Sequence, residues 1–279
     1  MTDPQIMGIL NVTPDSFSDG GRYASTSLAV EHALRMMEEG ADLIDVGGES
    51  TRPGAGRIPL DEEQRRVLPV IEELVARGIP VSIDTMNAPT AHAAAAAGAS
   101  MINDVSGGAA DPDMAAVAAE TGLPFIVMHW RGHSVTMQQH AVYADAPAEV
   151  RAELAARVVA LLDAGVQAAQ LILDPGIGFA KTAEQNWQIL ANLHELASLG
   201  HPVLVGVSRK NFLGRLLPEG APFESRDLPT AVISALAADA GVWGVRVHDV
   251  RSTKTAFAVR AAWQAGRHVD GRPRLRGVS

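Results

Sequence analysis

The chain has 279 residues and no cysteine. Without cysteine it can form no disulfide, offer no thiolate nucleophile and bind no metal through Cys ligands. This absence excludes thiol chemistry, but it does not by itself identify a cellular compartment.

The chain also lacks apolar runs long enough to cross a membrane, because charged residues and glycines interrupt its alanine-rich stretches. Its first residues, MTDPQIMGIL, contain no basic region followed by a long apolar region, so they do not resemble a secretory signal. We therefore expect a soluble, cytoplasmic protein that does not associate with a membrane.

Positive charge is scarce in the sequence. Lys and Arg number 23 against 32 Asp and Glu, which gives a formal net charge of -9. Binding to nucleic acid needs a basic surface, so this balance argues against it. If the substrate is an anion, the protein must gather its positive groups at one place.

The hydrophobic fraction of 47% supports a large core, and a short apolar run followed by a helical pattern recurs eight times. Several runs are continuous rather than alternating, which is typical of parallel strands buried on both faces. We predict a single (β/α)8 TIM barrel over residues 1–267, with a disordered basic tail over residues 268–279. A doubly wound open sheet is the structural alternative. The predicted strands are Ile6–Val12, Asp42–Gly47, Pro80–Asp84, Ser100–Val105, Pro124–His129, Gln170–Asp174, Pro202–Val207 and Trp243–His248.

Helical and irregular segments alternate with these runs. The clearest helical patterns cover Asp61–Arg77, Pro147–Ala164 and Ala183–Leu199. Glycines such as Gly40 and Gly165 stand between a helical pattern and the next strand, where they are expected to end helices. Irregular structure is expected in the segments Asp15–Ser25, Gly48–Pro59, Arg131–Ala144 and Leu216–Leu228.

Polar residues gather at the carboxyl ends of the predicted strands, which in a barrel converge on the mouth where catalysis occurs. Asp84 and Asp174 each close an apolar run, where an unpaired carboxylate is costly. They require a partner rich in donors, such as a ring edge with an amino group beside a ring NH. Taken singly, Asp104, Asp111 and Asp249 are better explained as turn or helix-capping residues. Further polar residues at these ends are Asn11, Asp45, Asn103 and His129.

The local positive site is predicted after the last two strands, where barrels often bind phosphate. Ser208, Arg209 and Lys210 follow the seventh strand. Arg246 and His248 end the eighth, two residues apart, so they share one face of it. Arg209 is also compatible with a solvated surface charge, whereas Arg246 is flanked by valines.

Other patterns do not support further chemistry. The glycine-rich pieces form neither a Walker A loop nor a dinucleotide-binding fingerprint, so no nucleotide cofactor is indicated. His129 lacks an HExxH context and is expected to be a hydrogen-bonded core histidine, with Met128 as a pocket wall. A serine nucleophile is not supported, because the sequence has no G-x-S-x-G motif.

Seven segments spread over almost the whole chain share an order and spacing with one known family. The segments are MGILNVTPDSFSDGG from Met7, DVGGESTRPGA from Asp45, SIDT from Ser82, INDVSGG from Ile102, LDPGIGFAKT from Leu173, VGVSRKNFLG from Val205 and GVRVHDV from Gly244. They resemble the dihydropteroate synthase family. The resemblance implies a barrel, a homodimer, Mg²⁺ as cofactor and two small-molecule substrates. These are (7,8-dihydropterin-6-yl)methyl diphosphate and 4-aminobenzoate, which give dihydropteroate and diphosphate in folate biosynthesis.

The resemblance also implies roles for individual residues. Asn11 matches the magnesium-linked position, and Asp19, Arg52 and Lys210 are the implied catalytic groups. The residues implied to bind the pterin are Asp84, Asn103, Asp174, Lys210, Met128 and Phe179. Those implied to bind the diphosphate are Thr51, Arg52, Arg246 and His248. Those implied to bind 4-aminobenzoate are Phe17, Thr51, Pro53, Phe179 and Ser208.

The sequence departs from the family pattern at two positions. Pro229 stands where many relatives have glycine, and Trp130 follows His129 where a smaller apolar residue is common.

Two other functions are alternatives to this interpretation. A pterin-binding methyltransferase that serves a corrinoid protein would share the barrel and the pterin acids, but it would not need the SRK and RVH groups. A non-catalytic pterin-binding homologue would lack the loop residues, and these are present here.

We predict ordered substrate binding. The residues implied to contact 4-aminobenzoate lie partly on two segments rich in Gly, Ser, Pro and Asp, and ordering such segments costs entropy that a small ligand does not offset. Calorimetric titration should therefore detect 4-aminobenzoate binding only after the protein is preloaded with a pterin, Mg²⁺ and pyrophosphate. Equal affinity with and without preloading would contradict this order.

Overall fold

The computed structural model describes residues 3–13, 21–49, 56–133, 135–266, 268–269 and 272–273. Eight parallel strands form one sheet in the order β6-β5-β4-β3-β2-β1-β8-β7. A parallel bridge between Leu173 of β6 and Val203, just before β7, joins the two ends of this order. The predicted (β/α)8 barrel is thus confirmed in place of the open sheet. The strands are β1 (Gln5–Asn11), β2 (Leu43–Gly47), β3 (Val81–Asp84), β4 (Met101–Asp104), β5 (Phe125–Met128), β6 (Leu171–Asp174), β7 (Leu204–Val205) and β8 (Gly244–Val247).

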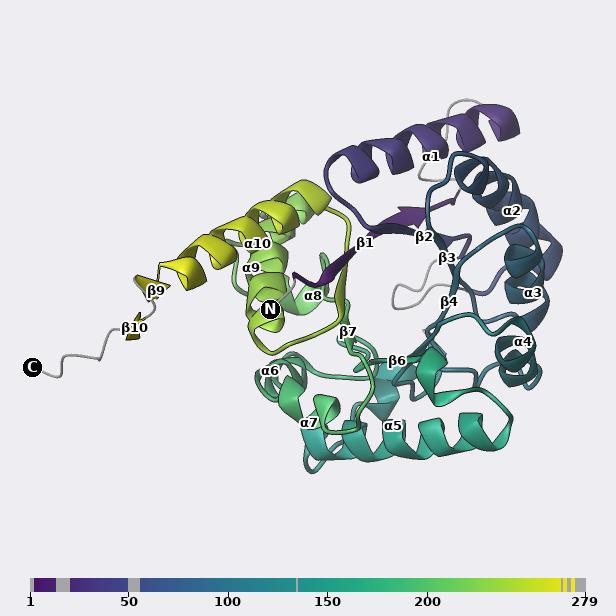
Figure 1. Cartoon of the computed structure of the whole chain (residues 1–279). Helices are drawn as coiled ribbons and strands as arrows, with labels where there is room; N and C mark the ends of the chain where they lie inside the picture. Colours follow the sequence, from purple (N-terminus) through teal and green to yellow (C-terminus); the bar gives the residue numbers. More distant parts are fainter. Residues whose placement is uncertain are drawn as a thin grey trace, which may run out of the picture.

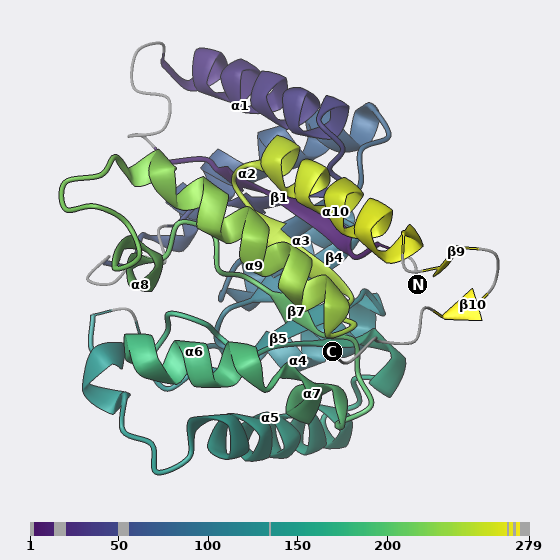
Figure 2. The same ribbon diagram turned by 90° about the vertical axis from the view of Figure 1, so that its left-hand side faces the viewer.

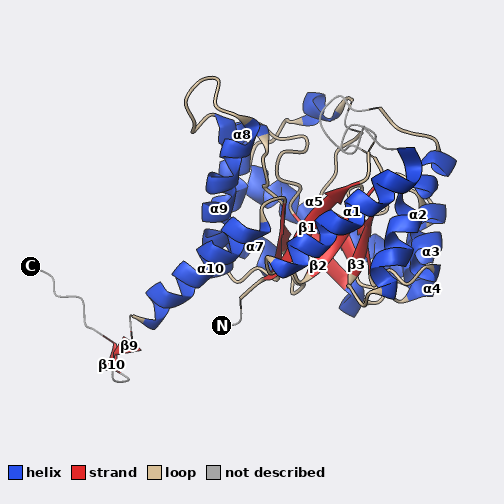
Figure 3. Ribbon diagram, turned by 90° about the horizontal axis from the view of Figure 1, so that it is seen from above, coloured by secondary structure: helices blue, strands red, loops and turns tan. Residues whose placement is uncertain are grey.

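Helices surround the strands on the outside of the barrel (Figures 1 and 3). Each α-helix packs an apolar face against the strands, and this layer between strands and helices is the main core. The α-helices are α1 (Gly21–Glu38), α2 (Leu60–Ala76), α3 (Ala88–Ala96), α4 (Met114–Thr121), α5 (Ala146–Asp163), α6 (Ala183–Ala191), α7 (Leu193–Ala197), α8 (Asn211–Gly214), α9 (Asp227–Asp239) and α10 (Val250–Ala265). The 3-10 helices are η2 (Met137–His140), η3 (Ala168–Gln170) and η4 (Phe223–Arg226).

The barrel interior is filled by side chains rather than open. A separate buried cluster takes one apolar residue from most strands. Their immediate neighbours along each strand, such as Ile6 and Ile102, belong instead to the main core, as the two-residue period of a strand requires. The interior is therefore plugged at the amino-terminal half of the strands. The cluster consists of Met7, Leu43, Met101, Ile126, Ile172 and Leu204, with Trp243 packed against it.

Some predicted boundaries differ from the structure. The helix predicted over Ala183–Leu199 is two helices, because the chain leaves helical geometry at Asn192 (φ -120°, ψ 31°). The segments predicted to be irregular contain the start of α1, all of η2 and η4, and the first residues of α9. Their polar, Gly- and Pro-rich sequences predicted loops and did not reveal these helical turns.

The predicted disordered tail contains a short antiparallel pair, β9 (His268–Val269) with β10 (Arg272–Pro273). The other residues of 267–279 lie outside the described part of the chain, so disorder of the tail stays a prediction. Across the ranges that are described, no helix combines the length and apolar character needed to cross a membrane.

Neighbouring leucines on α5 provide a test of the core. Leu161 is fully buried against the sheet, whereas Leu162 is 40% exposed. Replacing Leu161 by Ala should lower the free energy of unfolding by about 2–5 kcal/mol, because it removes apolar contacts and leaves a cavity. The matched variant Leu162→Ala should change it by about 0.5 kcal/mol or less. Urea unfolding of both variants measures the difference, and equal losses would contradict the packing.

Candidate active site

Polar side chains form the layer directly above the apolar plug. They lie two residues further along the strands, and this spacing returns each side chain to the interior face. Thus Asp45 follows Leu43, Asn103 follows Met101, and the same step leads from Ile172 to Asp174. On β3, β5 and β8 it leads from Ser82 to Asp84, from Ile126 to the apolar Met128 and from Gly244 to Arg246. On β1 and β7 the same step leads to Ile9 and Gly206, which are not polar.

Arg246 joins two carboxylates across this layer. Its Nε donates to Oδ2 of Asp45 at 2.5 Å, and its Nη2 donates to Oδ2 of Asp84 at 2.7 Å. Asn103 Nδ2 donates to the same Asp45 oxygen at 2.9 Å. Burial lowers the pKa of Arg246, but Asp45 and Asp84 outweigh that effect and raise it overall. The guanidinium is therefore a fixed positive charge that holds three strands together at the mouth.

Three carboxylate oxygens of this layer accept no hydrogen bond within the described part of the chain, and one of them, Asp45 Oδ1, is fully enclosed by protein. Arg246 occupies one oxygen of Asp84, and the Gly176 N–H donates to Oδ1 of Asp174 at 2.7 Å, which leaves Asp84 Oδ1 and Asp174 Oδ2. Both side chains are buried. Burial raises the pKa of Asp84 to about 7 despite Arg246, and burial also raises the pKa of Asp174. These acids are poised to accept donors from a ligand.

Lys210 lies against the loop that follows β6. Its ammonium donates to the Ile177 carbonyl and lies 4.6 Å from the centre of the Phe179 ring. Burial lowers the pKa of Lys210 to about 8, with the Asp174 carboxylate acting in the opposite direction. Gly178 permits this approach, because a Cβ at that position would lie 2.7 Å from the Lys210 Cδ.

An apolar wall adjoins the polar groups. Met86, Val105 and Met128 form a small buried cluster, and Phe179 packs against it. Met128 and Phe179 were predicted to be neighbours in one pocket, and the structure brings them together. Asn11 is half-buried at the end of β1, and its amide offers a neutral oxygen.

Ser208 and His248 form a pair beside this layer. Oγ of Ser208 lies 2.8 Å from Nδ1 of His248, and the backbone N–H of His248 donates to the same Oγ at 3.0 Å. Arg209 is not a solvated surface charge. Its Nε and Nη2 donate to the two oxygens of Asp227, both at 2.7 Å. Five predicted site residues, Phe17, Asp19, Thr51, Arg52 and Pro53, lie outside the described residues.

The residues assigned to structural roles occupy such roles. His129 is buried and hydrogen-bonded through both ring nitrogens. Asp104 accepts three hydrogen bonds in its own turn, and Asp249 caps α10 through the Ser252 N–H. Among the described ranges there is no group of three His, Asp or Glu side chains that could hold a metal ion.

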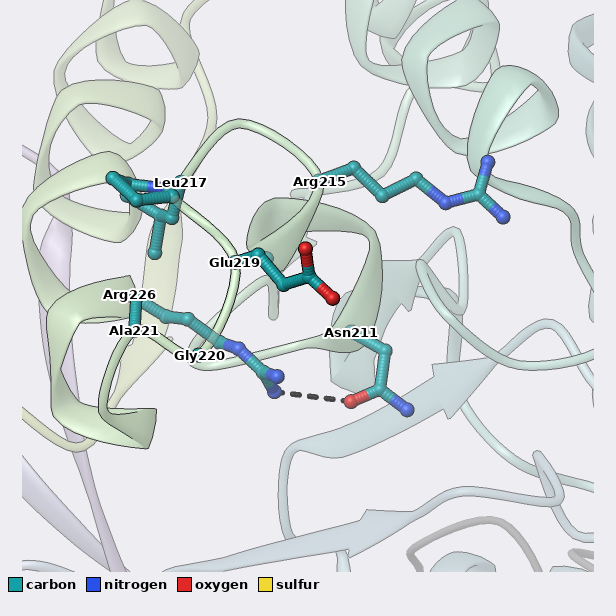
Figure 4. Close-up of a pocket in the computed structure, with 9 residues that line it drawn as sticks. Asn211, Arg215, Leu217, Glu219, Gly220, Ala221 and Arg226 are labelled. Atoms are coloured by element: carbon teal, nitrogen blue, oxygen red, sulfur yellow. Dashed lines mark hydrogen bonds between the residues drawn. The ribbon is translucent and has the colours of Figure 1, made fainter.

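A separate surface hollow of about 230 Å³ lies beside α8, and Figure 4 shows its lining. The Arg226 guanidinium donates to Asn211 Oδ1 at 3.0 Å there, and the Glu219 carboxylate points toward the same space. None of the predicted site residues lines this hollow. The barrel mouth therefore remains the candidate site.

Comparison with known proteins shows which family the chain belongs to. Residues 7–248 match the family model described as pterin binding enzyme. The chain is 53% identical over 272 residues to dihydropteroate synthase of Mycobacterium leprae, covering 95% of this chain and 96% of that protein. The chain belongs to the dihydropteroate synthase family.

Solved structures of the family share its fold. The dihydropteroate synthase of Xanthomonas albilineans with 4-aminobenzoic acid is 45% identical, with a TM-score of 0.87, and the match covers 96% of this chain and 94% of that one. A structure of that species' enzyme in complex with 7,8-dihydropteroate is 42% identical, with a TM-score of 0.84 and coverages of 96% and 95%.

Within the dihydropteroate synthase fold, two residues of the site were not assigned from the sequence. Asp45 binds Arg246, although its position at a strand end had suggested only a polar residue there. Lys181 is buried beside the loop after β6, and it is the one Lys or Arg between Arg157 and Arg209 in the sequence. That isolation among uncharged and acidic residues was the available signal.

The open carboxylate oxygens generate a prediction about pterin binding. Asp84→Asn and Asp174→Asn should each weaken binding of a pterin by about 1.5–3 kcal/mol, because each replaces a charged acceptor by a neutral amide. The fold should persist, since Asn occupies the same volume. Isothermal calorimetry measures the affinity, with Asp239→Asn on α9 as a control far from the mouth; unchanged affinity in both variants would contradict the assignment.

Proton release is a second readout of the same variants. The carboxyl of Asp84 has a pKa near 7 in the free protein, so it is largely protonated at pH 6. Ligand donors favour the ionised form, and affinity should therefore rise between pH 5 and pH 7 with release of a proton. Asp84→Asn should reduce the number of protons released at pH 6, measured by calorimetry in buffers of different ionisation enthalpy.

Proposed function

We propose that this chain is a dihydropteroate synthase that condenses (7,8-dihydropterin-6-yl)methyl diphosphate with 4-aminobenzoate to give 7,8-dihydropteroate and diphosphate. The observation that carries the proposal is the pair of buried acceptors, Asp84 Oδ1 and Asp174 Oδ2, facing a mouth that also holds Lys210. A pterin edge with an amino group beside a ring NH supplies the donors that these oxygens need.

The remaining groups complement a flat, polar ring. Lys210 donates to an acceptor on the other edge of the pterin, close to Asp174, whose carboxylate acts on its pKa. The apolar wall of Met86, Val105 and Met128 covers a ring face without competing for hydrogen bonds. Phe179 stands at the border of this wall and Lys210, where it contacts both the pterin and the incoming arylamine.

Diphosphate binds at the β7–β8 side of the mouth. The Nε and Nη2 atoms of Arg246 donate to the carboxylates of Asp45 and Asp84, and its Nη1 can donate to an anion. His248 and Ser208 stand beside it. Fixed positive charge and preformed donors stabilise the leaving group as its negative charge develops. Thr51 and Arg52, outside the described residues, belong to the same proposed diphosphate set.

The reaction needs no nucleophile from the protein. The C–O bond to diphosphate breaks first, and the dihydropterin ring shares the positive charge left on the exocyclic methylene. The amine of 4-aminobenzoate then forms the new C–N bond and loses a proton. The protein's part is to orient the two substrates, hold the diphosphate and exclude water, which is the competing nucleophile.

The proposed cofactor is Mg²⁺, and the described residues fit it in a limited way. Asn11 supplies a hard, neutral oxygen at the mouth, and no carboxylate cage exists among the described residues. Asn11 would hold the ion together with diphosphate oxygens, and the ion would neutralise the leaving charge when bound. Mg²⁺ should therefore bind weakly alone and well with pyrophosphate in calorimetry; tight binding to the ligand-free protein would contradict this.

One assay tests the function directly. Purified protein is incubated with the dihydropterin diphosphate, labelled 4-aminobenzoate and Mg²⁺, and labelled dihydropteroate and free pyrophosphate are measured. Equimolar formation of both products supports the proposal. Pterin binding without either product would favour a non-catalytic homologue, and methyl transfer from a methylated pterin to a corrinoid protein would favour the methyltransferase alternative.

We propose a homodimer that forms through α9 and α10, which lie side by side (Figure 2). Leu228, Val232 and Leu236 recur every fourth residue on α9 and are exposed, and Val259 and Trp263 do the same on α10. Exposed apolar residues that recur along two adjacent helices are typical of a face that is covered in an assembly.

A charge placed on the proposed interface tests the dimer. Leu236→Glu should convert the protein to a monomer, because it places a charge among the exposed apolar residues of α9. Val159→Glu is the matched control, since Val159 is 57% exposed against 63% for Leu236 and lies on α5, on another side of the barrel from α9 and α10 (Figure 1). Sedimentation equilibrium measures the mass; an unchanged mass for Leu236→Glu would exclude this interface.

A further inference from the structure

A buried lysine that the proposed reaction does not use lies beneath the loop after β6. Lys181 is 4% exposed, and its Nζ is 3.0 Å from each of three acceptors, the carbonyls of Gly176 and Phe179 and Nδ1 of His129. An ammonium has three protons, so this set satisfies it completely. Burial lowers the pKa of Lys181 to about 7, with Asp174 and Glu153 acting in the opposite direction. The three acceptors match the geometry of the ammonium form.

A series of hydrogen-bonded side chains runs from Lys181 to the surface. Because Lys181 donates to Nδ1, the proton of neutral His129 lies on Nε2, which donates to Glu153 Oε2 at 3.0 Å. Burial, together with Lys181, lowers the pKa of His129 to about 4, which keeps the ring neutral. Glu153 in turn accepts from Arg131, and its hydrogen bond from His129 lowers its pKa to about 2. The neutral His129 ring therefore links the Lys181 ammonium to the Glu153 carboxylate by two hydrogen bonds.

The loop held by Lys181 carries the pterin-site groups. Its Gly176 offers a carbonyl to Lys181 and an N–H to the Asp174 carboxylate. Three residues on, Phe179 gives its carbonyl to Lys181 and its ring to Lys210. One ammonium thus holds both ends of the segment that positions an acid and an aromatic wall of the proposed site.

The backbone of the Gly176–Ala180 segment has an unusual conformation. Gly176 and Gly178 have positive φ, and a Cβ on Gly176 would lie 2.4 Å from the His129 carbonyl oxygen. Ala180 also has a positive φ of 48°, which is unfavourable for a residue with a Cβ. A conformation of this kind persists only when surrounding contacts impose it. The Nζ contacts of Lys181, with the Asn186 side chain accepting from the Gly178 N–H at 2.7 Å, supply them.

We propose that Lys181 is a positioning residue for pterin binding, which acts through the Gly176–Phe179 loop and depends on His129 as its acceptor. This inference rests on the proposed function of the mouth as a pterin site. Lys181 touches no reacting atom, so its loss should affect binding of the pterin substrate more than the chemical step.

The first test uses Lys181→Met, which keeps the length and volume of the side chain and removes its donors. We expect the dissociation constant for a pterin and the KM for the dihydropterin diphosphate to rise about tenfold or more, as loss of charge-assisted hydrogen bonds implies. We expect kcat to change by less than about threefold. Lys254→Met, on the exposed face of α10, is the matched control and should change neither.

A double-mutant cycle distinguishes positioning from a general loss of stability. If Lys181 acts through Phe179, then Lys181→Met should weaken pterin binding much less in a Phe179→Ala background than in the native one. Additive effects would overturn the proposal, as would an unchanged pterin affinity in Lys181→Met.

A second pair of variants covers the case in which Lys181→Met does not fold. His129→Asn retains an oxygen near the position of Nδ1 as an acceptor for Lys181, whereas His129→Leu retains none. Affinity for a pterin should fall in His129→Leu and be preserved in His129→Asn; equal affinities would overturn the proposal. Failure of the native protein itself to bind a pterin would instead overturn the proposed function.

Discussion

The ion pairs between Arg246 and the carboxylates of Asp45 and Asp84 are the interaction on which the mouth of the barrel depends. These groups come from β8, β2 and β3, and each lies one step above an apolar plug. Asp45 and Asp84 are buried, and Arg246 is half-buried. A buried carboxylate without a partner is costly, and a buried guanidinium without one is costly too. Their mutual pairing permits a polar layer inside an apolar barrel, and Asn103 joins it through Asp45.

The pairing is incomplete, and this incompleteness gives the site its chemistry. One guanidinium cannot satisfy every oxygen of Asp45, Asp84 and Asp174, so acceptors remain at the mouth. Burial raises the pKa of Asp84, which means that the ionised carboxylate is unfavourable there in the absence of a ligand. A ligand with adjacent N–H donors removes the cost, so binding energy comes from groups that the fold leaves unsatisfied.

Although the chain is acidic overall, positive groups gather at this site. Of its three lysines, Lys181 is buried and Lys210 is half-buried around the loop after β6, and only Lys254 is exposed. With Arg246 they place positive charge beside Asp174 in a protein whose formal net charge is -9. The glycines of that loop let both lysines approach the backbone, because a Cβ on Gly178 would collide with Lys210.

The sequence by itself determined the number and order of the strands, the barrel and the polar strand ends. Continuous apolar runs and the two-residue period of a strand are local properties, so Asp84, Asn103, Asp174 and Arg246 could be placed at one mouth in advance. The tertiary structure alone decided which of them pair. Arg246 meets Asp45, which is 201 residues away in the chain, only because β1 lies between β8 and β2 in the sheet. For Lys181 the sequence showed only its isolation among uncharged and acidic residues, not its partners. His129 and Gly176 become neighbours only when β5 and β6 lie side by side, so packing rather than spacing along the chain sets these hydrogen bonds.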